Sequence, residues 1–359
     1  MNTAALVSGG VDSSVMLHLL KEQGVNPVIF YIKISMEDEL GQFDDCTFRD
    51  DLQIVAQLAK KYNCKFEIAD LHKDYWENVV NYTIQTVKNG LTPNPDILCN
   101  KIIKFGIFDE KFGADFDFLA TGHYANTQKI NQYSYLTTAK DQHKDQTYFL
   151  SALNQHQISR IQFPIGNLLK KEVRQIAINQ NLPSANRPDS QGICFLGKIN
   201  YNDFLERYLG KKEGNIVEAE TGKIWGKHQG FWFYTIGQRH GLKLGQGPWY
   251  VVGKNKEENI IYISKGITNE LLKEKVIFLN DFKFISNIPE FVNLSAIKFK
   301  IRHTPEFTSG TLEIEGNHAV IKSNVAISGI AAGQFGVVYD KDEKFCLASG
   351  VIANNGNYK

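Results

Sequence analysis

The sequence predicts an α/β protein in which a parallel-sheet domain is followed by a β-rich domain, expected to be a small barrel. The first third alternates short apolar stretches with amphipathic stretches of helical spacing. From about residue 213, short β-rich stretches follow one another with turn residues between them. Strand–helix alternation is typical of a parallel sheet covered by helices, whereas a run of strands indicates a separate β domain. A chain of 359 residues also exceeds one core of usual size, so two or three domains are expected.

Apolar spacing predicts the elements in order. The apolar run 4–8 predicts a buried strand, and 11–24 predicts an amphipathic helix that ends at Gly24. Further strands are expected at 28–34, 65–70 and 116–122, and further helices at 49–63, 74–90 and 170–181. The segment 183–197 is rich in Pro, Gly and Ser and predicts a long loop. Short strands are then expected at 260–264, 275–280, 296–302, 318–323 and 335–340.

Composition and cysteine usage limit the cellular setting. Forty basic and thirty-nine acidic residues give a net charge of +1, which neither requires nor excludes a nucleic-acid partner. The chain has no apolar run of about 18 residues and its first strand starts by Ala4, so we expect neither a membrane span nor a signal peptide. The five cysteines, at 46, 64, 99, 194 and 346, form no C-x-x-C pair. We therefore expect no structural zinc and a cytoplasmic, reducing environment.

A glycine-rich loop, SGGVDSS at residues 8–14, joins the first predicted strand to the first predicted helix. Gly9 and Gly10 allow the backbone to approach an anion closely, and amides at a helix N-terminus attract phosphate. Asp12 fits beside a phosphate only as a helix cap or as a ligand of Mg²⁺. The patterns G-x-x-x-x-G-K-S/T and G-x-G-x-x-G are absent, so the loop has no phosphate-gripping lysine of its own. A tight turn with a helix cap is the alternative explanation.

Cys99 lies in the stretch NPDILCNK, residues 94–101. The prolines on either side of Asn94 predict a helix start, and Asp96 is expected as the N-cap, so Cys99 falls at the third helical position. A thiol in the first turn feels the positive helix end, which lowers its pKa, and two following lysines act in the same direction. A buried structural cysteine is the alternative explanation.

Cys194 decides between these explanations. It lies in DSQGICF, residues 189–195, inside the long predicted loop. A mobile loop suits a group that must meet two partners. Two loop-proximal cysteines in a cytosolic α/β protein indicate sulfur chemistry, in which one carries a persulfide and the other resolves it. The alternative for Cys194 is a small hydrophobic residue that pins the loop.

Two further segments carry polar groups near predicted element ends. ATGHY, residues 120–124, follows a strand, so Gly122 would let a nucleotide approach and His123 is expected to contact a ligand. KDQTYFL, residues 144–150, places a basic, an acidic and an amide group before a helix, and a capped helix start on a solvated surface is its alternative explanation.

In the β-rich part, KFKIRH (298–303) alternates like a strand, which predicts Lys298, Lys300 and Arg302 on one face. Such a row of cations suits phosphate, although an exposed sheet face explains the pattern equally well. The aromatic run Trp232 to Tyr234 is expected in core packing, with RNA stacking as the alternative.

Together these segments resemble the tRNA-specific 2-thiouridylases, a family of PP-loop, N-type ATP pyrophosphatases. The matching stretches are SGGVDSS (8–14), TPNPDILCNKIIKF (92–105), ATGHYA (120–125), KDQTYFL (144–150), DSQGICF (189–195), HQGFWFYTIGQRHGL (228–242), PWYVVGK (248–254) and AAGQFGVVY (331–339). They extend over nearly the whole chain. The resemblance implies a PP-loop ATP-binding catalytic domain (1–198) of the adenine nucleotide alpha hydrolase-like fold, a small α+β central tRNA-contacting domain (199–270) and a C-terminal β-barrel domain (271–359).

The resemblance also implies roles for single residues. Cys99 would be the nucleophile, Cys194 the persulfide carrier and Asp96 the acid/base group beside the target base, which Asn94 and Pro95 would line. ATP would be held by Leu6, Val7, Ser8, Gly9, Gly10, Val11, Asp12, Ser13, Ile32 and Gly122. tRNA would be touched by His123, Lys144, Asp145, Gln146, Arg302, His303 and Gln334. Ile32 and Val7 stand where many members have Met, a mild departure because all three are apolar.

The expected reaction is ATP-dependent 2-thiolation of the wobble uridine of tRNA. Adenylation of the C2 oxygen makes AMP the leaving group, Mg²⁺ accompanies the nucleotide, and persulfide sulfur replaces oxygen, with a disulfide between Cys99 and Cys194 left to be reduced. The expected partners are tRNA and a sulfur donor, either a cysteine desulfurase or a sulfur-relay protein. Two alternatives remain: an amidating PP-loop ligase acting on a small carbonyl substrate, and an RNA-binding protein with an inactive ATP site.

Overall fold

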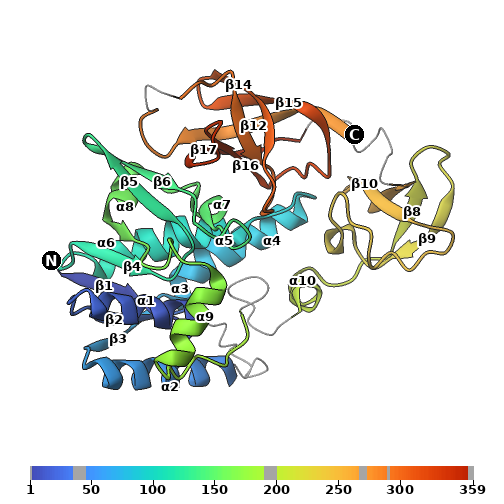
Figure 1. Ribbon diagram of the computed structural model, residues 1–359. Helices are drawn as coiled ribbons and strands as arrows, with labels where there is room; N and C mark the ends of the chain where they lie inside the picture. Colours follow the sequence, from blue (N-terminus) through green and yellow to red (C-terminus); the bar gives the residue numbers. More distant parts are fainter. Residues whose placement is uncertain (1, 35–45, 190–199, 267–272, 289–291, 355–359) are drawn as a thin grey trace.

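A computed structural model describes residues 2–34, 46–189, 200–266, 273–288 and 292–354 of the chain. It contains a five-stranded parallel sheet, a four-stranded central sheet and a closed barrel. In Figure 1 the barrel lies above the parallel-sheet domain, and the central sheet lies to the right of both. These three parts confirm the predicted fold class.

The parallel sheet has the strand order β3-β2-β1-β4-β7. Its strands are β1 (Thr3–Leu6), β2 (Val28–Lys33), β3 (Phe66–Asp70), β4 (Phe118–Thr121) and β7 (Ile161–Gln162). From β1 the chain adds β2 and β3 on one side and then returns to place β4 on the other side of β1. The carboxyl ends of β1 and β4 therefore flank the point where the strand order reverses, which is where open α/β sheets bind ligands.

Helices cover both faces of this sheet because alternate strand residues point to opposite sides. Ala5 faces the cluster formed with α1 (Val11–Glu22), α2 (Cys46–Tyr62) and α9 (Lys170–Asn179). Ala4 and Leu6 face the other cluster. That cluster packs against the remaining helical segments of the domain, which are α3 (His72–Tyr75), α4 (Asn81–Lys88), α5 (Pro95–Leu98), α6 (Phe108–Phe112), α7 (Thr147–Leu150) and α8 (Gln155–Arg160).

The helical stretches expected in this domain differ in detail from those observed. The helix predicted at 74–90 is interrupted by a π-helical turn at Trp76–Val80 between α3 and α4. A second π-helical segment, η2 (Cys99–Ile107), continues directly from α5 into α6. Wide helical turns of this kind are common at functional sites, and apolar spacing does not reveal them.

The C-terminal barrel has six strands. They are β12 (Lys273–Phe284), β13 (Ile297–Lys300), β14 (Thr308–Glu315), β15 (His318–Ser328), β16 (Phe335–Tyr339) and β17 (Phe345–Ile352). Pairing of β12 with β17 closes the barrel, whose interior holds the cluster around Ile277, Phe299 and Ile321. Closure leaves few exposed strand edges.

A hairpin of the first domain extends the barrel sheet. Strands β5 (Asn126–Ile130) and β6 (Tyr133–Thr137) pair with each other, and β6 pairs with β17 through Thr137 opposite Phe345 and Leu136 opposite Cys346. The pairing of β6 with β17 therefore joins the barrel to the parallel-sheet domain. Figure 1 shows the hairpin below the barrel, next to β17.

The central part starts with α10 (Tyr201–Leu209) and forms a sheet of order β10-β11-β8-β9. Its strands are β8 (Gly214–Glu218), β9 (Ile224–His228), β10 (Trp249–Asn255) and β11 (Ile260–Lys265), with a short 3-10 turn at Phe231–Phe233. Among the helices of the described ranges, none is long and apolar enough to cross a membrane.

Candidate active site

The loop 8–14 joins β1 to α1 at the switch point of the sheet. Gly9 has a φ of 77°, a backbone conformation that favours glycine, and Gly10 is the N-cap of α1. The Ser13 hydroxyl accepts from the Ser8 amide at 3.2 Å and donates to the Gly10 carbonyl at 3.1 Å. The hydroxyls of Ser8 and Ser13 lie 3.3 Å apart. The loop thus gathers hydroxyl groups beside a helix N-terminus, a donor set that fits phosphate.

Gly122, just after β4, packs directly against this helix start. A Cβ at this position would lie 2.7 Å from the Ser13 nitrogen and 2.9 Å from the Asp12 carbonyl carbon. Any side chain at position 122 would therefore push the start of α1 away from β4. Two segments that are more than a hundred residues apart in sequence meet here because β1 and β4 are neighbouring strands.

His123 follows Gly122 and is held by Thr121. Its Nδ1 lies 2.9 Å from the Thr121 hydroxyl. Desolvation, with a smaller effect of the nearby Lys104, lowers the pKa of His123 well below its usual 6.5. The imidazole is therefore neutral at pH 7, so it can offer hydrogen bonds but no positive charge.

Asp12 is engaged by two residues that the sequence did not single out. Lys170 Nζ lies 2.7 Å from Asp12 Oδ1 and 2.8 Å from Oδ2, and the Tyr124 hydroxyl donates to Asp12 Oδ1 at 2.9 Å. Lys170 is the first residue of α9. The sequence predicted that helix, but no motif linked it to the glycine loop.

Asp189 lies next to this pair and attracts three cations. Lys170, Lys144 and Arg174 approach its carboxylate at 2.9, 2.9 and 2.7 Å. Partial burial opposes ionisation, but the hydrogen bonds from Lys144 and Lys170 lower the pKa of Asp189 to about 2. The carboxylate is therefore charged at physiological pH and holds these side chains together.

The helix before Cys99 does not start as expected. Asn94, not Asp96, is the N-cap of α5, and its side chain accepts from the Ile97 amide at 3.3 Å. Pro95 and Asp96 are the first two helical residues, so Cys99 comes fifth and begins η2. The expectation that Cys99 sits in the first helical turn is wrong. Because the helix-dipole effect fades within that turn, the start of α5 acts on this sulfur less than the sequence predicted.

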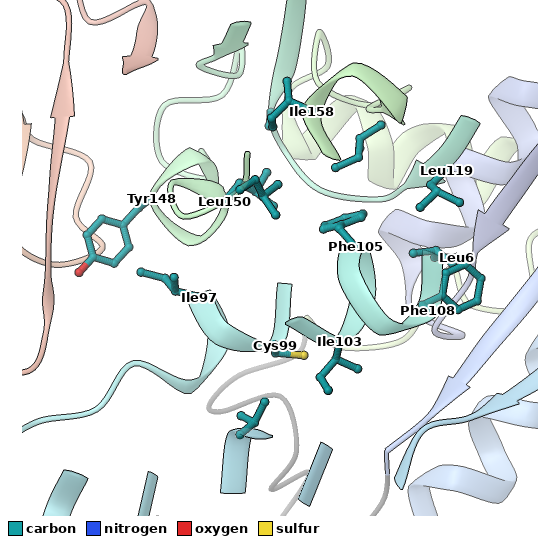
Figure 2. Packing of buried hydrophobic residues seen from close by; sticks show 14 of the residues in the cluster. Leu6, Ile97, Cys99, Ile103, Phe105, Phe108, Leu119, Tyr148, Leu150 and Ile158 are labelled. Carbon is teal, nitrogen blue, oxygen red and sulfur yellow. The ribbon is translucent and has the colours of Figure 1, made fainter. Parts of the chain in front are cut away.

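Cys99 is almost fully buried, with 1% of its surface exposed. Figure 2 shows it between Ile97 and Ile103, in the cluster that also contains Leu6 at the end of β1. The cluster therefore connects the thiol to the strand that carries the glycine loop. A reaction at Cys99 requires the sulfur to become accessible from this packed position.

The other cysteines differ in what the structure describes. Cys194 and the side chain of Cys46 lie outside the described residues. Cys346, on β17, is buried between the barrel and the first domain, where desolvation raises the pKa of its thiol well above 9.0. Cys64 is partly buried, and desolvation also raises its pKa. Both thiols are thereby held in the neutral form.

Gln334 connects the barrel to the segment before α5. Its Nε2 donates to the Pro93 carbonyl at 2.7 Å, and Asn94 Nδ2 donates to its Oε1 at 3.2 Å. The Thr92 amide also donates to the Ala332 carbonyl at 2.8 Å. The barrel thus holds the residues expected to line the target base.

The segment 144–146 is more deeply integrated than a solvated helix start. Asp145 is 3% exposed, and its carboxylate accepts from the Ala139 amide at 2.7 Å. Gln146 Oε1 accepts from the Tyr124 amide at 2.9 Å. His303 Nε2 lies 2.8 Å from the Asp145 carbonyl oxygen. The alternative explanation of a solvated surface is therefore wrong for Asp145.

The predicted alternation of 298–302 is present, since Ile297, Phe299 and Ile301 face the barrel interior, but the cations opposite them do not form an exposed row. Lys300 is 3% exposed, and its ammonium lies 3.9 Å from the centre of the Phe307 ring. Lys298 is paired with Glu343 at 2.9 Å. Arg302 is exposed and donates to the Ser328 carbonyl at 3.2 Å, so it remains the cation of this segment most open to an RNA.

The aromatic run Trp232 to Tyr234 is partly buried and packs against apolar clusters of the first domain and of the central sheet. Phe231 is buried, and Trp232 Nε1 donates to the Gly210 carbonyl at 3.2 Å. Phe231 and Trp232 line a cavity of about 330 Å³ together with Lys88, Leu209, Lys256 and Glu257. Core packing therefore accounts for Phe231, while Trp232 is half-buried at the cavity wall.

The fold and this loop define a class: an α/β protein of the adenine nucleotide alpha hydrolase-like type, followed by two β-rich parts. Three family models match the chain, a tRNA methyl transferase HUP domain over 1–198, a tRNA methyl transferase PRC-barrel domain over 202–265 and an aminomethyltransferase beta-barrel domain over 274–352.

Sequence identity to curated proteins identifies the family within this class. The tRNA-specific 2-thiouridylase MnmA of Parabacteroides distasonis is 58% identical, over 98% of this chain and 99% of the relative. The 2-thiouridylases MnmA of Porphyromonas gingivalis and MnmA 1 of Bacteroides thetaiotaomicron are 55% and 54% identical to this chain. Each match also covers 98% of this chain and 99% of the relative. A solved structure, the predicted subunit of tRNA methyltransferase from Methanocaldococcus jannaschii, covers 50% of this chain and 76% of its own with a TM-score of 0.33 and 18% identity. The chain belongs to the tRNA-specific 2-thiouridylase family.

Proposed function

We propose that the protein is a tRNA-uridine 2-sulfurtransferase that replaces the C2 oxygen of the wobble uridine with sulfur at the expense of ATP. The observation that carries this proposal is the identity of 51 to 58% to 2-thiouridylases over 98% of the chain. The matching family models carry methyltransferase descriptions. We favour sulfur transfer because the chain combines a PP-loop with two cysteines in matching motifs.

ATP is proposed to bind through the loop 8–14, with Gly122 as the close wall and Ile32 beside the adenine. The fit is supported by the helix N-terminus and the two facing hydroxyls, while the absence of a side chain at Gly122 lets β4 approach the start of α1. Mg²⁺ would accompany the nucleotide, bound mainly through phosphate and water, since Asp12, the carboxylate of the loop, is already engaged by Lys170 and Tyr124. No group of three His, Cys, Asp or Glu occurs in the described ranges, but Mg²⁺ in phosphate sites commonly takes only one or two carboxylates besides phosphate and water.

The proposed chemistry proceeds in three balanced steps. The uridine C2 oxygen attacks the α-phosphorus of ATP, and pyrophosphate leaves. The terminal sulfur of a Cys194 persulfide then attacks C2, and AMP leaves with the oxygen. Finally, the Cys99 thiolate attacks the Cys194 sulfur, which breaks the persulfide bond, leaves sulfur on the base and forms a disulfide. Two electrons from an external thiol reductant restore both cysteines.

The substrate base is proposed to enter beside Asn94, Pro95 and Asp96. Asp96 would manage the proton of the base, and the contact of Asn94 with Gln334 supports a fixed position for this segment. A wobble base must leave its stack to reach such a site. His123, Lys144, Arg302 and His303 are proposed to contact the RNA, whereas the buried Asp145 and the engaged Gln146 would act by shaping this surface.

The proposed setting is the cytoplasm, since the catalytic disulfide must be reduced after each turnover. The proposed sulfur donor is a cysteine desulfurase or a sulfur-relay protein, because the persulfide on Cys194 needs an external source of sulfur.

Mass spectrometry of tRNA nucleosides tests the function. Purified protein is incubated with unmodified tRNA, ATP, Mg²⁺, a cysteine desulfurase with cysteine as the persulfide source and a thiol reductant, and 2-thiouridine is expected at the wobble position. AMP and pyrophosphate release is measured with and without tRNA. Release that needs no tRNA would favour the amidating ligase, and tRNA binding without any AMP would favour the inactive RNA-binding protein.

A further inference from the structure

The glycine-rich loop 8–14, the proposed phosphate loop, contains no lysine of its own. The fold places a lysine from a distant helix beside this loop. Residues 8–14 contain no basic side chain. Lys170, about 160 positions later, begins α9, which packs against α1. Its ammonium lies 2.7 Å from the carboxylate of Asp12, the second residue of α1. The cation is therefore within one side-chain length of the helix N-terminus.

The surroundings of Lys170 keep its ammonium at this position. Asp12 holds it on one side and Asp189, 2.9 Å away, on the other, while the Tyr124 ring lies 5.9 Å below the nitrogen. Three cations, Lys144, Lys170 and Arg174, face these two carboxylates. A third carboxylate, Asp141, accepts from the Lys170 backbone amide at 2.9 Å, so the charges of the cluster are balanced before an anion binds. Lys170 is the cation of this cluster that contacts the first turn of α1, where the helix amides attract an anion.

Another cation near the loop is oriented differently. Arg187 donates to the Gly9 carbonyl at 3.0 Å and is paired with Asp51. Its guanidinium therefore satisfies the backbone oxygen of the loop and a carboxylate. The Lys170 ammonium instead lies at the amide end of α1, where an anion is attracted.

We propose that Lys170 is a phosphate-binding residue of the nucleotide site, supplying to the pyrophosphate of ATP the positive charge that the loop itself lacks. This inference rests on the proposed ATP-dependent function of the same site. A lysine ammonium is a compact charge with three donors on a flexible stem, so it can keep Asp12 and still reach a phosphate oxygen. Asp12 and Asp189 keep this side chain ordered in the absence of the anion.

Calorimetric titration of the full chain with Mg²⁺–ATP, inorganic pyrophosphate and AMP tests the proposal. We expect Lys170→Gln to weaken binding of ATP and pyrophosphate by about 10- to 100-fold, because a charged hydrogen bond is lost. AMP affinity should change less than about twofold. Lys170→Arg, which keeps the charge, should retain most of the pyrophosphate affinity.

The neighbouring Lys171 is the matched control, because it lies on the same helix, is exposed and carries the same charge. Lys171→Gln should bind pyrophosphate like the wild type. If Lys170 only pins α9 to α1, Lys170→Gln lowers the melting temperature but leaves the pyrophosphate affinity at the wild-type value, and the proposal is overturned. Should Lys170→Gln misfold, a tenfold or greater loss of pyrophosphate affinity in Lys170→Arg also overturns it. A wild-type protein that binds neither ATP nor pyrophosphate would instead overturn the proposed function itself.

Discussion

At the scale of single residues, the site contrasts groups that are held neutral with groups that are held charged. Desolvation keeps His123 and Cys346 uncharged, whereas three cations keep Asp189 ionised. Cys99 is buried among apolar side chains. A thiol there is protected from chance oxidation, and its reactivity depends on what else enters the site.

Exchange of buried cysteines separates chemistry from packing. Cys99→Ser is expected to fold normally and to lose 2-thiouridine formation, because the hydroxyl cannot form the disulfide that releases sulfur to the base. Cys346→Ser is the matched control: it is equally buried, and the serine can replace the contact of Cys346 with the Thr147 carbonyl. Nucleoside mass spectrometry and melting temperatures are measured for both. Normal thiolation by Cys99→Ser would contradict its role as the nucleophile.

The pH dependence of stability reports on His123. Its pKa is lowered in the folded state, so below about pH 6.5 the unfolded chain binds this proton more readily and stability falls. One such proton changes the free energy of unfolding by at most about 1.4 kcal/mol per pH unit. Urea unfolding at pH 7 and pH 5 should therefore show a smaller loss of stability for His123→Gln than for the wild type. Equal losses in both proteins would show that His123 titrates normally.

At the scale of elements, the residues of the site lie at the ends of helices and strands. These are the carboxyl ends of β1 and β4 and the N-termini of α1 and α5. The close approach of β4 to α1 leaves no room for a side chain at Gly122. The cap of α5 comes from Asn94, which also contacts the barrel through Gln334. Each end is thus positioned by a partner distant in the sequence.

Filling the space at Gly122 should distort the phosphate loop. Gly122→Ala places a methyl group 2.7 Å from the Ser13 nitrogen, and we expect about 1–3 kcal/mol of destabilisation together with weaker ATP binding. Gly245→Ala is the control, because its Cβ would meet no atom within 4 Å. ATP affinity by calorimetry and unfolding by urea are compared. Unchanged ATP affinity in Gly122→Ala would contradict the placement of the nucleotide here.

At the scale of the whole molecule, the barrel and the catalytic domain form one continuous structure. Strand β6 pairs with β17, and Gln334 holds the segment before α5. The residues proposed to meet the target base are therefore positioned by a domain about 240 residues further along the chain. This arrangement explains why a PP-loop domain alone would lack a complete site.

Removing the hydrogen bonds of Gln334 to the segment before α5 should weaken tRNA binding and thiolation more than ATP binding. Gln334→Ala removes its hydrogen bonds to Pro93 and Asn94, each worth about 1 kcal/mol. We expect slower thiolation and weaker tRNA binding, with ATP affinity unchanged. Thiolation rates and tRNA affinity are measured beside ATP titration. An equal loss of ATP binding would indicate a general structural defect.

The sequence by itself determined the strand–helix alternation of the parallel-sheet domain, five of the later strands, the phosphate loop and the segments that carry the family resemblance. These features are local: apolar spacing, glycines at a strand end and short motifs each act within a few residues. The sequence did not predict the β5–β6 hairpin or the strands β8, β9, β10, β14 and β17. Asp96 was predicted as the cap of α5, whereas Asn94 caps the helix and Pro95 takes the first helical position, where proline is favoured.

Only the tertiary structure decided which distant side chains meet. Lys170 reaches the loop because α9 packs on α1, and Lys300 is buried because Phe307 and Tyr339 cover it on the outer side of the barrel. The physical reason is that contacts between elements depend on sheet order and on helix packing, and no spacing rule within a single element encodes either of them.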